Sequence, residues 1–261
     1  MSTNIYMNLH FRKYGEGQAL IILHGLFGQS DNWNAIAKKL AENNLSVYTV
    51  DLRNHGLSPH SDEMNYPLMA EDVKSLIDKE YIQSPILMGH SMGGKVSMWV
   101  DYLFPNLLKK LIVVDIAPKA YLPGHTDVFN ALNAIDFNVI KTRKEAETVL
   151  KKHLTNEAVV QFLLKNIYWE TSEKLNWRFN LKSIQTHYEE ILKPLPTYSS
   201  PTNTLFIRGE KSPYITNDDW KEIIKIYLNA HLVTIPNAGH WVHAEQPALF
   251  IDTILNFIKC D

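Results

Sequence analysis

Cysteine is almost absent from this chain of 261 residues, and no apolar run approaches the roughly 20 residues that a membrane-spanning helix needs. The single cysteine, Cys260, cannot form an internal disulfide, which is typical of proteins from a reducing compartment. The amino-terminal segment lacks the apolar core of a signal peptide. We therefore predict a cytoplasmic protein that does not span a membrane.

An excess of charge of one sign is also lacking, since the formal net charge is only −2. Such a balance provides no basic surface of the kind that attracts nucleic acids or anionic membranes. His240 and His243 are three residues apart, but no usual zinc-ligand pattern surrounds them. The sequence thus predicts no metal, no other cofactor, no nucleic-acid partner and no membrane partner. It gives no prediction of the oligomeric state.

One short stretch, PILMGHSMGGKV at residues 85–96, combines an apolar run, a G-x-S-x-G motif and a segment compatible with a helix. A serine on a sharp strand-to-helix turn presents its hydroxyl clear of both elements, which is the arrangement of a nucleophile elbow. Gly89 and Gly93 leave room where strand and helix crowd together. A helix N-cap would explain Ser91 but not the glycines around it, so the pattern favours Ser91 as a nucleophile.

Short apolar runs alternate with segments of helical periodicity at both ends of the chain. Predicted helices begin near Asp31, Pro67 and Pro247, and the predicted strands cover residues 19–23, 45–50, 85–88, 111–114, 204–207 and 231–235. This alternation predicts an α/β fold with a mostly parallel sheet that is flanked by helices on both faces. Ligands of such sheets bind beyond the carboxyl ends of the strands, where this chain has its polar loops.

The alternation of predicted strands and helices is interrupted between residues 119 and 200. This segment shows no convincing strand, and it contains helical patterns at 128–135, 142–154, 157–167 and 181–192. Thr142 and Glu145 have the spacing of a capping box. We therefore predict a core made of residues 1–118 and 201–261, with residues 119–200 inserted as a helical lid over the site.

A serine hydroxyl needs a base to remove its proton and an acid to orient that base. His240 follows the last predicted strand and is the better candidate base, with His243 as a weaker alternative. Asp115 and Glu210 each follow a strand, so either fits the chain order of serine, acid and histidine. From the residues alone, the choice between these two acids stays open.

The negative oxygen formed on attack needs two N–H donors. The residue after the nucleophile supplies one, which is Met92 N–H, and the loop after an earlier strand supplies the other, assigned to Leu26 N–H. His24, His55 and His90 are interpreted as packed or hydrogen-bonded histidines rather than as catalytic bases.

Taken together, these motifs resemble the α/β-hydrolase superfamily and, at finer grain, the bacterial YbfF-type esterases. The segments that carry this resemblance are HGLFG at 24–28, RNHGLSP at 53–59, DIAP at 115–118, WRFN at 177–180, SPY at 212–214 and GHWVHAE at 239–245. The resemblance implies hydrolysis of carboxylic esters or acyl thioesters of small to medium acyl groups. Many α/β-hydrolases carry Gly-x-x-Asp after the later strand, and this chain has Ser212 there, which implies that Asp115 is the acid.

Aromatic residues are frequent in the predicted lid, and a few of them are expected to line an apolar acyl pocket. The candidate substrate contacts are Phe27, Trp177, Arg178 and Trp241. Arg178 is suited to a substrate carboxylate or phosphate, but an ordinary surface salt bridge explains it equally well.

Two other readings remain open from the sequence. The same fold supports other reactions, such as those of perhydrolases, C–C bond hydrolases and lyases, and it also supports ligand-sensing receptors without catalysis. Product analysis distinguishes the reactions from one another, and a measurement of turnover distinguishes an enzyme from a receptor.

Overall fold

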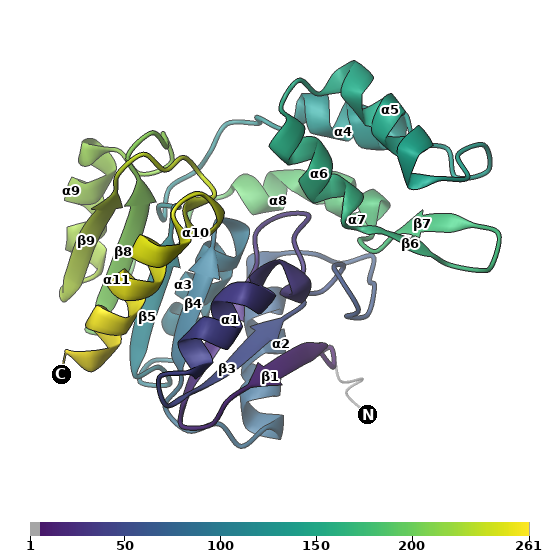
Figure 1. Ribbon diagram of the computed structural model, residues 1–261. Helices are drawn as coiled ribbons and strands as arrows, with labels where there is room; N and C mark the ends of the chain where they lie inside the picture. The colour runs from purple at the N-terminus through teal and green to yellow at the C-terminus, as the bar shows by residue number, and fades with distance from the viewer. Residues whose placement is uncertain (1–5, 261) are drawn as a thin grey trace.

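A seven-stranded sheet organises the protein, whose computed structural model describes residues 6–260 (Figure 1). The strand order is β1-β3-β2-β4-β5-β8-β9, and every neighbouring pair is parallel except β1 with β3. The mostly parallel sheet that the sequence predicts is thus confirmed. The strands are β1 (Phe11–Tyr14), β2 (Gln18–Leu23), β3 (Leu45–Val50), β4 (Ile86–His90), β5 (Lys110–Val114), β8 (Thr204–Gly209) and β9 (Ala230–Ile235).

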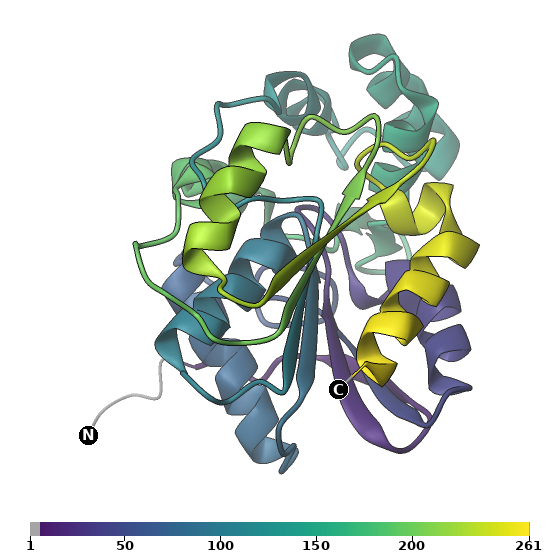
Figure 2. The same cartoon turned by 90° about the vertical axis from the view of Figure 1, so that its left-hand side faces the viewer.

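Helices cover both faces of this sheet, which is why the central strands are buried along their whole length. Every residue of β3, β4 and β5 is buried. Figure 2 shows α1 and α11 on one face and α2, α3 and α9 on the other. These helices are α1 (Asn34–Ala41), α2 (Tyr66–Lys79), α3 (Met92–Leu103), α9 (Asn217–Ile226) and α11 (Pro247–Lys259).

Residues 119–200 leave the sheet between β5 and β8 and form a group of short elements, which we call the lid segment. In Figure 1 it lies at the edge where the parallel strands end. Its helices are α4 (Thr126–Asn133), α5 (Arg143–His153), α6 (Glu157–Leu164), α7 (Leu181–Thr186) and α8 (Tyr188–Leu192). The predicted capping box is present, because Thr142 and Glu145 each accept the backbone N–H of the other.

Two expectations for the lid segment were wrong. It does contain strands, since β6 (Ile167–Trp169) and β7 (Leu175–Trp177) form an antiparallel hairpin. Strands of three residues are too short to show an alternating pattern, and α6 ends before them, where Asn166 N–H bonds to the carbonyl of Leu163. The single helix expected at 181–192 is two helices, because the backbone of His187 leaves the helical region between α7 and α8.

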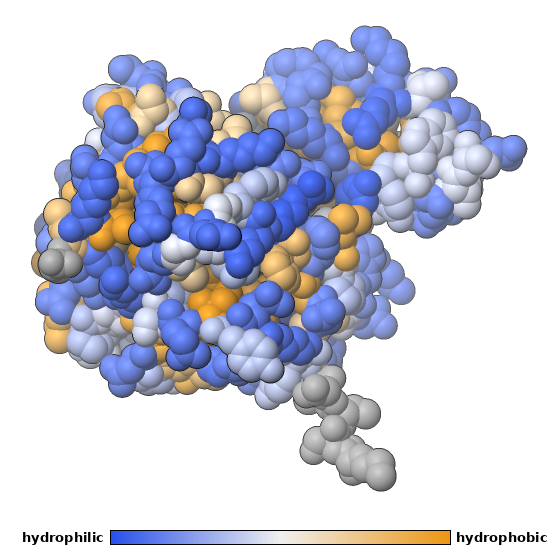
Figure 3. Space-filling view, turned by 60° about the horizontal axis from the view of Figure 1, so that its bottom comes forward, coloured by the Kyte–Doolittle hydropathy of each residue, from blue (hydrophilic) through white to orange (hydrophobic). Residues whose placement is uncertain are grey.

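Figure 3 shows the molecule with the bottom of the view in Figure 1 turned forward. Among the described residues, this view shows mainly hydrophilic side chains, with apolar residues in separate groups between them. Within residues 6–260, no helix has both the length and the apolar character to cross a lipid bilayer.

Candidate active site

Ser91 occupies the sharp turn between β4 and α3. Its φ of 53° and ψ of −119° lie outside the regions that residues other than glycine ordinarily adopt. Ser91 N–H donates to the carbonyl of Val114 at 3.0 Å, which ties the turn to the end of β5. The strained backbone thus occurs at the residue that the sequence selects as a nucleophile, as functional sites often show.

Glycines make the close approach around this turn possible. A Cβ on Gly89 would lie 2.1 Å from the carbonyl oxygen of Gly93. A Cβ on Gly93 would lie 2.5 Å from the carbonyl oxygen of His24 at the end of β2. The motif glycines therefore let α3 begin directly against β4 and β2, so that its amino end points toward the loop after β2.

His240 and Asp115 are brought together from the ends of β9 and β5. The Nδ1–H of His240 donates to Oδ2 of Asp115 at 2.7 Å. Asp115 is fully buried, whereas the His240 side chain keeps 25% of its exposure. Because Nδ1 carries the proton, Nε2 of His240 is left as an acceptor and is free to remove a proton from a nearby hydroxyl.

The alternative acid, Glu210, lies elsewhere. Its Oε2 accepts the backbone N–H of Asn237 at 2.9 Å, on the turn after β9. Ser212 instead donates its hydroxyl to Oδ2 of Asp115, the oxygen that also accepts from His240. Ser212, which ends the Gly-x-x-Ser sequence after β8, thus contacts Asp115, which follows the neighbouring strand β5.

The two candidate oxyanion donors are backbone N–H groups without a hydrogen-bond acceptor among the described residues. Neither Leu26 N–H nor Met92 N–H donates to another group among the residues that the structure describes. Met92 is the first residue of α3, where backbone N–H groups have no partner within the helix. Leu26 lies in the loop after β2 and follows Gly25, where an added Cβ would lie 3.3 Å from the Cβ of Ser91. Both N–H groups are therefore available to a bound oxyanion.

Three further histidines near the site have structural partners. His24 and His55 each donate through Nδ1 to a backbone carbonyl and accept a backbone N–H at Nε2, from Leu52 and Phe27. Burial lowers the pKa of His24 to about 4 and that of His55 to about 3. His90 donates Nε2–H to the carbonyl of His240 at 2.9 Å, and burial holds its pKa well below 6.5.

His243, the weaker candidate base, stacks on Trp33 with ring centroids 4.1 Å apart. Its Nδ1 is buried without a hydrogen-bond partner among the described residues. Burial lowers the pKa of His243 to about 3, so the ring is neutral at physiological pH. No carboxylate within residues 6–260 bonds to it, whereas His240 is paired with Asp115.

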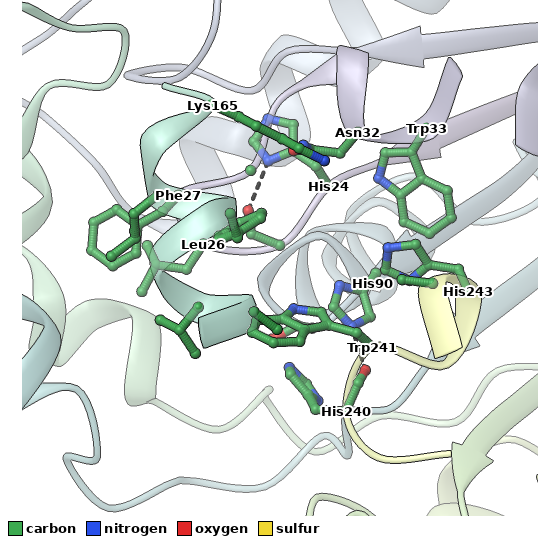
Figure 4. Close-up of a pocket in the computed structure, with 18 of the residues that line it drawn as sticks. His24, Leu26, Phe27, Asn32, Trp33, His90, Lys165, His240, Trp241 and His243 are labelled. Atoms are coloured by element: carbon green, nitrogen blue, oxygen red, sulfur yellow. Dashed lines mark hydrogen bonds between the residues drawn. The ribbon is translucent and has the colours of Figure 1, made fainter. Parts of the chain in front are cut away.

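A cavity of about 620 Å³ opens beside Ser91 and His240 (Figure 4). Its volume is in the range of small-molecule sites. The core contributes the loop after β2, the start of α1 and the loop before α10 (Val242–Glu245), while the lid segment contributes α4 and α6. Apolar side chains line much of it, including Leu26, Trp33, Ile36, Val128, Val159, Phe162 and Trp241.

Of the four candidate substrate contacts, Phe27 and Trp241 border this cavity. Trp177 and Arg178 are not among the lining residues. Trp177 lies within the lid segment, where it stacks on Phe179 at 5.1 Å. Arg178 places its guanidinium over the ring of Tyr168 at 4.7 Å, and no ion pair of Arg178 occurs within residues 6–260. We therefore leave these two residues out of the substrate site.

Sequence reasoning missed two contacts of the histidine–acid pair. Tyr214 stacks on the His240 ring with centroids 4.0 Å apart and an interplanar angle of 18°. Ser212 bonds to Asp115, as described above. The segment SPY at 212–214 was a motif of the resemblance, but only the fold shows that both of its ends contact the same site. Among the described residues, no group of three or more His, Cys, Asp or Glu could hold a metal ion.

Comparison with known proteins identifies the family. The sequence profile of the alpha/beta hydrolase fold matches residues 18–247. The chain belongs to the α/β-hydrolase family. This α/β-hydrolase is similar to Esterase YbfF of Escherichia coli, with 36% identity over 243 residues that cover 92% of each chain. It is also 40% identical over 257 residues to an sn-1-specific diacylglycerol lipase of Danio rerio, covering 94% of this chain and 80% of that protein.

A solved structure agrees with these relatives. A marine microorganism esterase superposes on this α/β-hydrolase with a TM-score of 0.94 and 44% sequence identity, covering 96% of this chain and 99% of that one. The fold class and the resemblance to YbfF-type esterases, both predicted from sequence motifs, are thus confirmed.

Proposed function

We propose that this α/β-hydrolase is a serine hydrolase that cleaves carboxylic esters or acyl thioesters of small-molecule substrates. The observation that carries the proposal is the 2.7 Å hydrogen bond between His240 and Asp115, formed at the cavity that Ser91 also borders. A base oriented by a buried acid is the arrangement that activates a serine hydroxyl. The names of the relatives, esterase and lipase, support the same reaction class.

The reaction follows from the positions of these groups. Nε2 of His240 removes the proton of Ser91 as its oxygen attacks the carbonyl carbon of the substrate. The N–H groups of Leu26 and Met92 stabilise the oxyanion that forms. The C–O or C–S bond then breaks, and His240 donates the proton to the departing alcohol or thiol. Water, activated by the same histidine, hydrolyses the acyl-enzyme and restores Ser91.

The acyl group binds in the apolar part of the cavity. Phe162 of α6 and Trp241 of the core face each other there with ring centroids 5.7 Å apart. A volume of about 620 Å³ that is shared with the reacting groups suits acyl chains of small to medium length. Since Val128, Val159 and Phe162 all belong to the lid segment, we assign it the role of a lid that determines acyl preference.

The test uses a fluorophosphonate probe on wild type and Ser91→Ala, read by intact mass, beside nitrophenyl esters of increasing acyl length. We expect one adduct on wild type, none on the variant, and ester turnover that Ser91→Ala abolishes. An adduct without ester turnover would point to another reaction of this fold. Neither adduct nor turnover would contradict the proposal and favour a ligand-sensing receptor.

A further inference from the structure

The loop that carries the oxyanion donor Leu26 is a tight turn with an unusual residue in it. Gly28 N–H donates to the carbonyl of Gly25 at 2.9 Å, which closes a β-turn around Leu26 and Phe27. Of these two central residues only Phe27 has a positive φ, 59°, as the third residue of a type II turn does. Glycine or asparagine ordinarily occupies that position, so other contacts must hold a phenylalanine there.

Both backbone polar groups of Phe27 are engaged. Its N–H donates to Nε2 of His55 at 3.2 Å. Its carbonyl accepts from the side-chain amide of Asn166 at 2.9 Å. Because these bonds fix the two peptide groups that flank Phe27, they also fix the orientation of the turn in which Leu26 N–H lies. His55 belongs to the core, whereas Asn166 belongs to the lid segment.

The ring of Phe27 is held by the lid segment as well. It packs against Phe129 of α4 at 5.7 Å and against Phe179, which follows β7, at 5.1 Å. The loop makes one more bond to the lid segment, from the Gln29 amide to the carbonyl of Lys165 at 3.3 Å. The turn is thus held by the lid segment as well as by the core around it.

The surroundings of Asn166 indicate why an asparagine is present. The residue is fully buried, and its Oδ1 has no hydrogen-bond partner among the described residues. An unpaired buried acceptor destabilises the fold, and an apolar side chain of the same size would avoid that cost. What the amide contributes is its donor, directed at Phe27 and, at 3.4 Å, at the carbonyl of Phe162.

We propose that Asn166 is a positioning residue that holds the turn at Leu26 in the geometry of an oxyanion hole, so that this half of the hole depends on the lid segment. The inference rests on the proposed function. It predicts that loss of the Asn166 donor weakens transition-state stabilisation without weakening ground-state binding of the ester.

The test compares Asn166→Leu and Asn166→Asp with a matched control. Leucine keeps the size of the side chain without its donor, and aspartate keeps the shape but directs an acceptor at two carbonyls. The control is Tyr66→Phe, which removes a 2.7 Å hydrogen bond from the core to the lid carbonyl of Ile191. Phe129→Leu loosens the same turn through its ring contact, and it replaces any Asn166 variant that does not fold.

For each protein, kcat and KM for a nitrophenyl ester are measured together with the inhibition constant of a boronic acid, which forms an oxyanion-like adduct. Removal of one oxyanion donor typically costs about 10²–10³-fold in turnover, and misplacement of a donor costs less. We expect kcat of the Asn166 variants to fall roughly 10-fold to 100-fold with KM nearly unchanged. Boronate affinity should fall by a similar factor, and Tyr66→Phe should resemble wild type.

The inference is overturned if folded Asn166 variants keep the wild-type kcat and boronate affinity, or if Tyr66→Phe shows the same loss. In either of those cases wild-type turnover still supports the proposed function. If wild type itself neither hydrolyses esters nor reacts with the fluorophosphonate, both proposals fail together.

Discussion

The carboxylate of Asp115 lies in a fully buried position, where an isolated charge would be strongly disfavoured. Three donors surround it: His240 through Nδ1–H, Ser212 through its hydroxyl, and Gly209 through its backbone N–H at 3.1 Å. Both oxygens of the carboxylate thus accept hydrogen bonds. Such an environment fixes the carboxylate in place and lets it orient the ring of His240.

The choice between the two acids can be tested at these residues. We expect Asp115→Asn to lower kcat by up to about 10⁴-fold, because the amide no longer fixes the tautomer of His240. Glu210→Gln should change turnover little, since Glu210 bonds to the N–H of Asn237 outside the site. Steady-state assays on both variants decide the assignment. A near-normal rate for Asp115→Asn would reject it.

The role of a single residue could be predicted only where a motif or its position in the chain marks it. Ser91 and His240 are selected by motif and chain position, before any geometry is known. The two acids could not be separated by position because both follow parallel strands, and β5 and β8 are neighbours in the sheet. Trp177 and Phe27 look equally suitable as aromatic contacts, but the direction of a side chain in a lid depends on packing that no local pattern records.

At the scale of elements, the site depends on how closely α3 begins against the sheet. Gly93 in its first turn lies against the end of β2, with the carbonyl oxygens of Leu23 and His24 each 2.5 Å from where a Cβ would stand. Those neighbours are backbone atoms of a central strand, and they cannot move without disturbing the sheet. Any side chain at this position must therefore displace the helix.

We expect Gly93→Ala to lower the free energy of unfolding by about 1–3 kcal/mol through overpacking, and to reduce turnover because Met92 N–H moves with the helix. Gly124→Ala is the matched control, since its nearest neighbour would be 3.9 Å away and its φ is not positive. That control should stay within about 0.5 kcal/mol of wild type. Urea unfolding measures both variants, and equal stability would contradict the crowding argument.

Elements with strong local signals were predictable, and those without them were not. Helices begin near Pro67 and Pro247, and the Thr142 capping box precedes α5, as their residue types predict. The β6–β7 hairpin was not predicted, because strands of three residues are too short to show an alternating pattern of apolar and polar residues. Its stability comes from contacts such as Trp177 on Phe137 and Phe179, which are visible only once the lid is assembled.

At the scale of the whole molecule, buried histidines make folding sensitive to acid. His24 and His55 have only 1% and 0% of their surface exposed, and desolvation lowers their pKa to about 4 and about 3. The folded protein keeps both rings neutral, whereas the unfolded chain protonates them near pH 6.5. Between these pH values the unfolded state binds more protons, so stability is lost as pH falls below 6.5.

Each of these two histidines should lower the free energy of unfolding by about 1 kcal/mol between pH 7 and pH 5.5, a range above the usual titration of carboxylates. Urea unfolding at the two pH values measures the decrease. In His24→Asn the difference between the two pH values should shrink by about 1 kcal/mol. A variant with an unchanged difference would show that His24 titrates alike in the folded and unfolded states.

The contact between Ser212 and Asp115 concerns the question of which strand must carry the acid of such a site. Ser212 already contacts the carboxylate that bonds to His240, so Ser212→Asp would bring a second acid to the same place. We expect Ser212→Asp to restore part of the turnover that Asp115→Asn removes, which assays of the double variant can check. Activity in the double variant would show that either of two adjacent strands can carry the acid. The choice of strand would then not be a requirement of catalysis.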